Sequence, residues 1–478
     1  MNARRYASLT AIASALFLAG CASVAPDGLR SDVQQQTQNN LPTGAQLSSF
    51  DKEQKEAART QVADWLKAPV DADTAVRIAL LNSPALQAQL ADLAAQDAQR
   101  AQALTLFNPT LTLGRFTSGH EREIERQLSF SLVNVITLPW RSRWLGWQME
   151  QATLTASQQV LITAAQTRRA WLRAVAAEQE LKANEQMFEA AQLGAELARR
   201  MTSIGNFNKL DQARELSLQH EAAAQLSRAR LAAHSEREQL AQLMGVWGPQ
   251  ADFQLPAQLP ALPKAASDLR SGKDAEQTAL RERLDLRALR RNLDETADHG
   301  VWAGVGAVFG DIGASYSRNT STDRATGHDD ITRGWEIDLP LPIFDWGGSA
   351  SAGARANVQR SAAQLTATAI QARGEARTSW LRYRTAWDLA HQQQTEVLPL
   401  AKLVQDETVL RYNGMFASVW ELLGQARKTT QAVVNATQAQ RDFWLAETDL
   451  NLALTGTSPG GFTALSGAAS AANSTDNH

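Results

Sequence analysis

The most informative segment of the sequence is Trp335-Glu336-Ile337-Asp338-Leu339-Pro340-Leu341-Pro342-Ile343-Phe344-Asp345-Trp346-Gly347-Gly348. Its first five residues alternate large apolar side chains with carboxylates, and this period of two predicts a β-strand with one apolar face. The two prolines cannot donate hydrogen bonds to a sheet, so the strand should end there. The Gly-Gly pair then leads into a long stretch rich in Ala, Gln and Arg, which favours helix. Such a strand suits a membrane barrel, with one face on lipid and the other on water.

The pattern around this segment occurs twice in the chain. A first repeat is predicted over 71–245 and a second over 276–456, each with the order helix, two strands, very long helix, turn and helix. Their β-hairpins are expected at about 109–138 and about 301–340. A proline-rich connector at 246–275 separates the two repeats.

The first repeat contains the longest predicted helix. Two alternating segments, Thr110–Leu113 and Leu128–Leu132, predict strands on either side of a polar turn at 118–121. Trp140 to Arg200 then contains no proline and is dense in helix-forming residues. At about 1.5 Å per residue this helix would approach about 90 Å, which is too long for a compact domain. The turn Gly205-Asn206-Phe207-Asn208 should end it.

The second repeat is expected to follow the same plan. A helix should run from Arg283 to about His299, followed by a strand over Val301–Ser317 and a polar loop over Arg318–Asp330. After the next strand, a helix should run from Gly348 to about Tyr412. Pro399 lies inside that helix, where its missing N–H and its ring predict a kink.

The beginning of the chain has the pattern of a bacterial lipoprotein signal. A positively charged start precedes a charge-free apolar stretch, and Leu18-Ala19-Gly20 places small residues before the single cysteine, Cys21. Residues 1–20 are therefore predicted to be a removed signal peptide, with lipid attached covalently to Cys21. A plain signal peptide with a coincidental cysteine is the alternative. Ala22, in place of an Asp, implies sorting to the outer membrane.

Two further segments are predicted to lie outside the repeats. The segment 21–70 is rich in Gln, Asn, Ser and Asp, a composition that buries little apolar surface and predicts an extended spacer, either a wrap or an N-terminal tether. The Ser/Ala/Asn-rich tail at 457–478 is predicted to be disordered.

Composition and charge exclude several classes of protein. The longest strongly apolar, charge-free run in the 478 residues is Ala7 to Ala19, shorter than the about 20 residues of a membrane-spanning helix. This excludes a polytopic helical membrane protein. The 47 basic and 50 acidic side chains give a formal charge of −3, so no polybasic surface points to nucleic acid. One cysteine rules out internal disulfides and thiolate metal clusters.

The sequence contains no recognisable catalytic or metal-binding motif. It lacks a Gly-rich phosphate loop, a His-Glu-x-x-His pattern and a nucleophile elbow. The seven histidines are scattered, and His220 and His234 lie several turns apart on a predicted helix, which favours solvated side chains over a metal site. We therefore expect no enzyme, no metal site and no cofactor apart from the lipid on Cys21.

At this point the sequence resembles the TolC family of outer-membrane efflux channels, in particular its lipoprotein branch. The resemblance covers about 71–456. It rests on the lipoprotein signal and on three motifs: Asn108-Pro109-Thr110-Leu111, the strand-to-helix segment 339–348, and Arg411-Tyr412-Asn413-Gly414 with 417–423 behind it. It implies a mainly α fold with a membrane β-barrel portion. Each protomer of a homotrimer would give four strands to one shared 12-strand barrel and long helices to a hollow periplasmic cylinder.

The resemblance also implies a function. Members of the family form the outer-membrane exit duct of a tripartite efflux system. The duct passively conducts small solutes, such as drugs or metal ions, from an inner-membrane pump and a periplasmic adaptor to the outside. The chain would then be anchored by lipid in the bacterial outer membrane, with a long periplasmic portion.

Elementary physics agrees with a shared barrel. Four strands cannot close a barrel alone. Open strand edges cannot face lipid, because each backbone group left without a hydrogen-bond partner there costs several kcal/mol. Five tryptophans near the predicted strand–helix borders suit an interfacial aromatic belt, with ordinary packing at a junction as the alternative. They are Trp140, Trp144, Trp147, Trp335 and Trp346.

The two helix turns, at Gly205-Asn206 and Asn413-Gly414, are predicted to lie farthest from the strands and to meet the adaptor. The charged residues close to them are candidates for a periplasmic gate held shut by weak polar pairs: Asp211, Arg214, Glu421 and Arg427. Glu421 matches an acidic position of the family, whereas an alternative register puts Lys209 in the place of Asp211. A solvated helix surface is the alternative for each of the four.

Two rival functions remain open from the sequence. One is a structural periplasmic coiled-coil lipoprotein without transport, which would have no reason for amphipathic strands. The other is a periplasmic hydrolase on a helical scaffold. Heat-modifiable trimers in outer-membrane fractions would separate the efflux duct from both.

Overall fold

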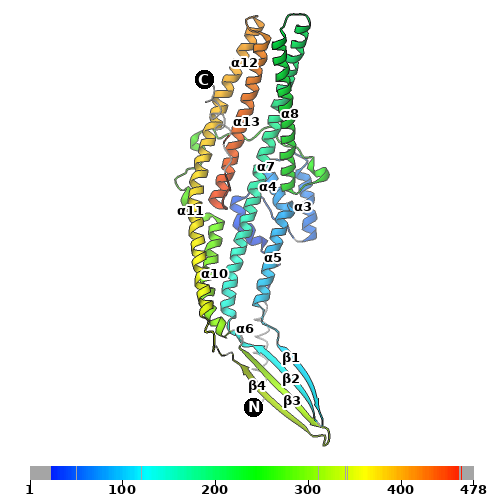
Figure 1. Ribbon diagram of the computed structural model, residues 1–478, viewed down its shortest axis with the longest axis vertical. Coiled ribbons are helices and arrows are strands. Elements are labelled where there is room, and N and C mark those ends of the chain that lie inside the picture. Colours follow the sequence, from blue (N-terminus) through cyan, green and yellow to red (C-terminus); the bar gives the residue numbers. More distant parts are fainter. Residues whose placement is uncertain are drawn as a thin grey trace. The chain divides into compact units, whose positions relative to one another are not determined.

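The computed structural model describes residues 23–49, 51–119, 121–309, 312–339, 341, 343–461 and 465. Within them the chain consists of long helices and four strands (Figure 1). Cys21, the predicted signal peptide and most of the predicted tail at 457–478 lie outside the described residues. The predictions made for them therefore stay predictions.

The chain divides into two compact units, and neither of them coincides with a sequence repeat. The first unit comprises Met1–Leu29, Leu90–Thr155 and Leu286–Thr368. The second comprises Arg30–Gln89, Ala156–Asp285 and Ala369–His478. Each unit is therefore assembled from parts of both repeats.

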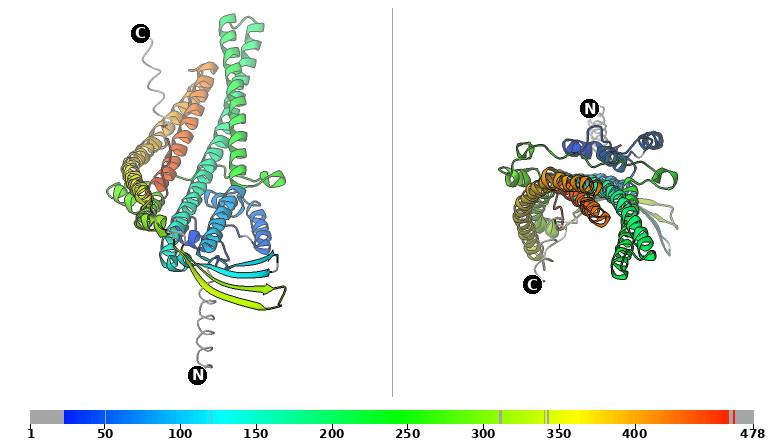
Figure 2. Two further views of the ribbon diagram at one scale, coloured as in Figure 1. Left: turned by 60° about the horizontal axis from the view of Figure 1, so that its bottom comes forward. Right: turned by 90° about the horizontal axis from the view of Figure 1, so that it is seen from above.

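The first unit contains one antiparallel sheet in the order β1-β2-β3-β4. The strands are β1 (Thr110–Ser118), β2 (Glu121–Ser131), β3 (Gly313–Asp323) and β4 (Asp329–Asp338). Leu111 lies opposite Leu128, Leu128 opposite Tyr316, and Tyr316 opposite Trp335, so these four side chains share one face. Figure 2 shows the strands as one curved layer, and β1 and β4 are its two edges.

The two faces of this sheet differ in chemistry, because paired residues point to the same side. One face carries the apolar row of Leu111, Leu128, Tyr316 and Trp335, and the Tyr316 and Trp335 rings lie 5.0 Å apart. The other face carries hydroxyls, amides and carboxylates. Its acidic residues are Glu121, Glu123, Glu125, Asp323, Asp330, Glu336 and Asp338.

Four helices adjoin the sheet in the chain. They are α5 (Pro84–Leu104), α6 (Leu132–Ile136), α10 (Leu284–Phe309) and α11 (Gly348–Gln392). Two of the predicted belt tryptophans pack in this unit: the Trp140 ring lies 4.3 Å from that of Trp302, and the Trp144 ring lies 4.9 Å from His299. Trp335 and Trp346 are exposed, and the interfacial belt stays a prediction.

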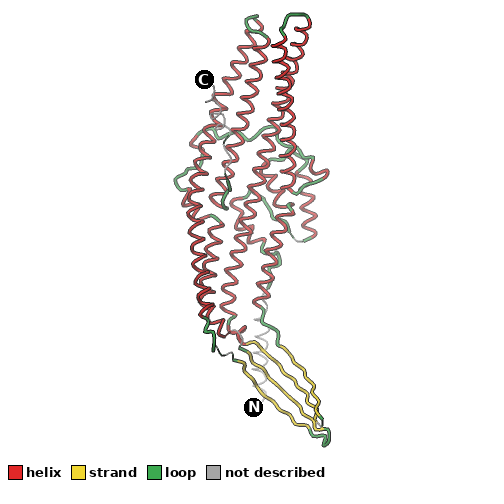
Figure 3. Tube along the Cα trace, viewed as in Figure 1, coloured by secondary structure: helices red, strands yellow, loops and turns green. Residues whose placement is uncertain are grey.

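Two long helical hairpins dominate the second unit (Figure 3). In one, α7 (Leu138–Ser203), which belongs to this unit from Ala156 on, is followed by α8 (Lys209–Met244). In the other, α12 (Leu398–Asn413) is followed by α13 (Val419–Thr455). The 66 residues of α7 confirm the very long helix expected from its composition. Gly245 ends α8 in the left-handed conformation, with φ +68°, which glycine adopts at little cost.

Two clusters of buried side chains stabilise the second unit. One surrounds Trp171, whose indole N–H donates to the Val70 carbonyl at 2.7 Å, and includes Phe253 and Met244. The other is built around Tyr383 and Phe443, whose rings lie 5.3 Å apart. Shorter elements complete the unit: α4 (Ala72–Asn82), α9 (Ala275–Glu282), and the single-turn helices η2 (Gly248–Ala251) and η3 (Ala266–Asp268).

The described part of the N-terminal segment, 23–49 and 51–70, is not the extended spacer that its polar composition predicted. It contains α2 (Arg30–Thr37), η1 (Gln38–Asn40) and α3 (Lys52–Trp65). Val33 and Val62 are fully buried, and the Arg30 guanidinium donates to the Ser48 carbonyl at 2.6 Å. A few apolar anchors at helical positions are therefore enough to fold a segment of low overall hydrophobicity.

Two boundaries predicted in the second hairpin are wrong. Val301–Phe309 belongs to α10 and is not strand, because Trp302 packs on Trp140 and this segment has no strict alternation. The polar loop expected over Arg318–Asp330 shrinks to residues 324–328, because Arg318 to Thr322 pair with β4. Polar side chains in this segment are therefore compatible with a strand, because one face of such a sheet contacts water.

Pro399 changes the helix in a defined way. Residues Gln393–Val397 form a π-helical turn, η4, between α11 and α12, and the Leu398 N–H donates to the Gln393 carbonyl five residues back. A proline cannot donate and its ring clashes with the carbonyl four residues before it, so the wider turn accommodates it.

No helix among the described residues is both long enough and apolar enough to cross a membrane.

Candidate functional site

The ends of the two helical hairpins are built alike. Asn208 accepts a hydrogen bond from the Asp211 backbone N–H at 2.7 Å, and Ser418 accepts one from the Glu421 N–H at 3.1 Å. Asp211 and Glu421 thus occupy the same position in the first turns of α8 and α13. A carboxylate is favoured there because unpaired N–H groups make a helix N-terminus partially positive. Capping accounts for both acids independently of any gate.

The two turns touch through an aromatic pair that the sequence analysis did not single out. The rings of Phe207 and Trp420 stack with centroids 4.8 Å apart and planes inclined by 24°. Phe207 comes from the turn after α7, and Trp420 from the first turn of α13. This stack therefore ties one hairpin end to the other within a single chain.

A second contact between the hairpins lies further along the helices. The Arg427 guanidinium on α13 is 3.6 Å from the Glu215 carboxylate on α8, and both side chains are largely buried. A Cβ added to Gly194 on α7 would lie 3.1 Å from Leu423 and 3.3 Å from Glu215. Three helices therefore approach closely here, and Gly194 provides the space.

The structure does not bring the four predicted gate residues together in one chain. Asp211 pairs with Arg214 on its own helix at 3.0 Å, and Arg427 pairs with Glu215. Glu421 is exposed, and no ion pair involves it among the described residues. Glu215 was missed in the sequence analysis although it lies one helical turn after Asp211, because its partner is distant in sequence.

Apolar side chains project from the same hairpin ends. Met415 and Phe416 are 93% and 87% exposed, and Ile204 and Leu210 are also open to solvent. Met415 has φ +65°, a conformation that L-residues rarely adopt. A strained loop that presents large apolar groups is typical of a surface that binds another protein.

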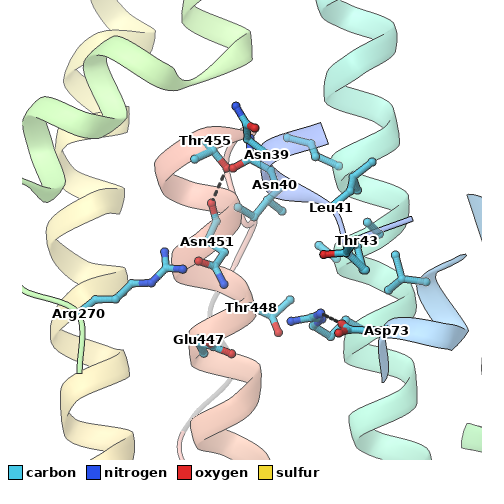
Figure 4. A pocket seen from close by; sticks show the side chains of 17 residues that line it. Asn39, Asn40, Leu41, Thr43, Asp73, Arg270, Glu447, Thr448, Asn451 and Thr455 are labelled. Atoms are coloured by element: carbon cyan, nitrogen blue, oxygen red, sulfur yellow. Dashed lines mark hydrogen bonds and ion pairs between the residues drawn. The ribbon is translucent and has the colours of Figure 1, made fainter. Parts of the chain in front are cut away.

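A polar cavity of about 380 Å³ lies elsewhere in the second unit (Figure 4). It is bounded by the segment Asn39–Thr43 and by Arg270, Glu447 and Asn451. The Arg168 guanidinium forms an ion pair with the Asp73 carboxylate, and both residues line the cavity. Burial raises the pKa of Glu447, while Arg168 and Arg270 oppose the rise. The cavity has no group of three metal-ligating side chains, nor has any other described part of the chain.

No protein-family model and no curated protein matches the sequence. Solved structures do match the fold. The CmeC outer membrane channel of Campylobacter jejuni has a TM-score of 0.67 at 15% identity, over 82% of this chain and 87% of that chain. VceC, an outer membrane protein of Vibrio cholerae, has a TM-score of 0.62 at 15% identity, over 85% and 99%.

The open state of the Neisseria gonorrhoeae MtrE outer membrane channel has a TM-score of 0.58 at 16% identity, over 81% of this chain and 90% of that one. The fold class expected from the sequence is therefore confirmed. At these low identities, what the matches establish is that the fold is shared.

Proposed function

We propose that this chain, which has the fold of outer-membrane channels, is the outer-membrane exit duct of a tripartite efflux system. The observation that carries the proposal is the combination of an amphipathic four-stranded sheet with two long helical hairpins in one chain. Channels with that combination align over more than four-fifths of this chain. The duct would conduct small solutes, drugs or metal ions, passively and without catalysis.

The open sheet supports a homotrimer. β1 and β4 are edge strands of the sheet, and lipid would leave their outer backbone groups without hydrogen-bond partners. Strands from neighbouring copies supply those partners, and four strands from each of three protomers close a 12-strand barrel. The acidic face of the sheet would then line the pore and the apolar face would meet lipid.

The hairpin ends are the surface we assign to the periplasmic adaptor and, through it, to the inner-membrane pump. They lie at the far ends of α7 and α12, and they expose Met415 and Phe416. The Phe207–Trp420 stack and the Arg427–Glu215 pair would hold the two hairpins together in the closed duct. Asp211, Arg214 and Glu421 would contribute only weak exposed pairs to the gate, each worth about 0–1 kcal/mol.

The function predicts pores of a defined assembly. The full-length protein purified from outer-membrane fractions should migrate as a trimer that heating converts to a monomer, and it should form ion-conducting pores in planar bilayers. Both properties follow from a barrel that only three copies can close. A monomeric, non-conducting protein would contradict the proposal and would favour the structural coiled-coil lipoprotein, for which the four amphipathic strands have no purpose.

Lipid on Cys21 is the second part of the proposed localisation. Cys21→Ser should abolish labelling by radioactive palmitate, because Cys21 is the single cysteine of the sequence and its thiol is needed for lipid attachment. The variant should still form trimers in the outer membrane, since a barrel buries far more apolar surface than acyl chains. Ala22→Ser is the matched control and should be labelled like the natural protein. Labelling of the Cys21→Ser protein would overturn this assignment.

A further inference from the structure

Three arginines lie side by side on the apolar face of the sheet. Arg318 lies opposite Arg333 in the β3–β4 register. In the β2–β3 register, Gln127 is opposite Ser317 and Ile124 is opposite Thr320, which puts Arg126 opposite Arg318. We call Arg126, Arg318 and Arg333 the arginine row. All three side chains are exposed.

The arginine row borders the apolar row of the same face. Two residues away along each strand lie Leu128, Tyr316 and Trp335, on the side farther from the hairpin turns. Leu113, opposite Arg126, continues the apolar surface up to the level of the row on β1. The row of apolar side chains is therefore followed, on the side of the turns, by a row of cationic ones.

Among the described residues, no ion pair neutralises any arginine of the row. Asp329 shares this face near the turn and accepts a hydrogen bond from the Thr322 hydroxyl at 2.6 Å, and the other acids of the sheet project from the opposite face. The polar contact of Arg126 is with a neutral hydroxyl, that of Thr320, at 3.4 Å. Like charges directly opposite each other on neighbouring strands repel, because their side chains begin only about 5 Å apart. Three unneutralised guanidiniums at this spacing favour an external anion.

We propose that the arginine row binds phosphate groups of phosphorylated lipids in the outer leaflet of the outer membrane. The proposal rests on the proposed function, which places this face against lipid. A guanidinium is planar and always charged, and it donates two parallel hydrogen bonds to a phosphate. The apolar row beside it suits the acyl chains of the same molecule. A lipid therefore satisfies both chemistries, whereas a soluble anion satisfies one.

The position of the row agrees with this leaflet. An arginine on the lipid face is costly at the middle of a bilayer and nearly free of cost near the interface. The row lies on the turn side of the apolar row, and the turns of both hairpins point away from the helices along the strands. The adjacent Tyr316 and Trp335 rings are of the type that concentrates at a membrane interface. The row thus lies at the outer end of the row formed by Leu128, Tyr316 and Trp335, and of the strand residues that the structure describes on this face only Ile124 and Ile331 continue apolar side chains beyond it.

The test measures lipid binding by the full-length trimer in non-ionic detergent, using fluorescent bisphosphorylated lipid A and the same lipid with its phosphates removed. The natural protein should bind the phosphorylated form about tenfold or more tightly than the other, a difference of about 1.4 kcal/mol per factor of ten. The triple row variant, which combines Arg126→Gln, Arg318→Gln and Arg333→Gln, should lose this preference. Inorganic phosphate at millimolar concentration should leave the lipid bound.

A matched control removes the same charge elsewhere. Arg228→Gln, Arg355→Gln and Arg360→Gln change exposed arginines of α8 and α11, and this protein should bind like the natural one. If the triple row variant fails to assemble, Arg318→Gln alone should weaken binding severalfold. The proposal would be overturned if the natural trimer bound the two lipids equally, or if inorganic phosphate displaced the lipid. It would also be overturned if the control variant lost as much lipid binding as the triple row variant. A conducting trimer with no phosphate preference refutes the row alone, whereas absence of trimers and pores refutes the proposed function.

Discussion

Trp420→Ala should make the closed duct leak. The Trp420 ring stacks on Phe207 and is the aromatic contact that joins the two hairpin ends within one chain. Such a pair contributes about 0.5–1.5 kcal/mol beyond the burial of its surface. Losing it should raise the open fraction of the pore up to about tenfold, since about 1.4 kcal/mol corresponds to a factor of ten. Single-channel recording in planar bilayers measures this fraction.

The neighbouring turn offers a control for this prediction. Phe416 is 87% exposed, so Phe416→Ala removes an aromatic ring from the same end without breaking the stack. Its open fraction should equal that of the natural protein. Phe207→Ala should leak like Trp420→Ala, and the double variant should leak no more than either single one, because both changes remove the same contact. Equal open fractions in Trp420→Ala and Phe416→Ala would show that the stack does not hold the duct shut.

Periodicity and turn residues were sufficient to predict the order of the elements. Helix-forming composition without proline predicted α7, and the turn Gly205-Asn206-Phe207-Asn208 predicted where it ends. The alternation in Trp335–Leu339 predicted β4. These features act over a few neighbouring residues, so they are visible in the sequence itself.

The features that the sequence analysis missed depend on contacts between distant residues. The helical state of Val301–Phe309 accompanies a packing contact of Trp302 with Trp140. The full length of β3 depends on its pairing with β4, because its Ser, Thr and Asn residues alone are typical of a loop. Likewise, α2 and α3 are stabilised by a few buried side chains, such as Val33 and Val62, that an average over a polar segment conceals.

The same difference between local and distant contacts explains which residues of the hairpin ends the sequence analysis found and which it missed. Charge and proximity to a turn selected Asp211 and Glu421, and both lie where a helix N-terminus favours an acid. The contacts that join the hairpins involve Phe207, Trp420 and Glu215, whose partners are distant in sequence. A sequence can therefore indicate which residues suit a turn, but the pairs that would close a gate require the fold.

The largest loss of stability is expected at Arg283. This guanidinium is 1% exposed and donates to Asp285 at 2.6 Å and to Glu375 at 2.7 Å. Thr457 and Ser458, just after α13, donate to the same two carboxylates, so the cluster fastens the end of α13 to α11. Arg283→Met would leave the carboxylates of Asp285 and Glu375, which are 15% and 14% exposed, without their cation. Breaking a buried pair in this way costs about 3–5 kcal/mol.

The measurement is thermal unfolding of the trimer in detergent, followed by circular dichroism at a fixed scan rate. Arg281→Met is the matched control, because the Arg281 side chain is 79% exposed and its pair with Glu282 lies at the surface. Such pairs contribute about 0–1 kcal/mol, so the control should unfold close to the natural protein. Similar midpoints for the two variants would show that the cluster does not stabilise the fold.

Glu375 makes the same cluster dependent on pH. Burial alone would raise its pKa, but hydrogen bonds from Ser458, Arg283 and Gln371 hold it below the ordinary value of 4.5. A carboxyl whose folded pKa is lowered stabilises the protein above its unfolded pKa, and this contribution is lost as the pH falls through the folded value. Glu375→Gln should therefore destabilise the trimer at pH 7, and the difference in midpoint from the natural protein should shrink below about pH 4.5. A difference that stayed constant from pH 7 to pH 3 would mean that packing, and not the charge of Glu375, holds the end of α13 in place.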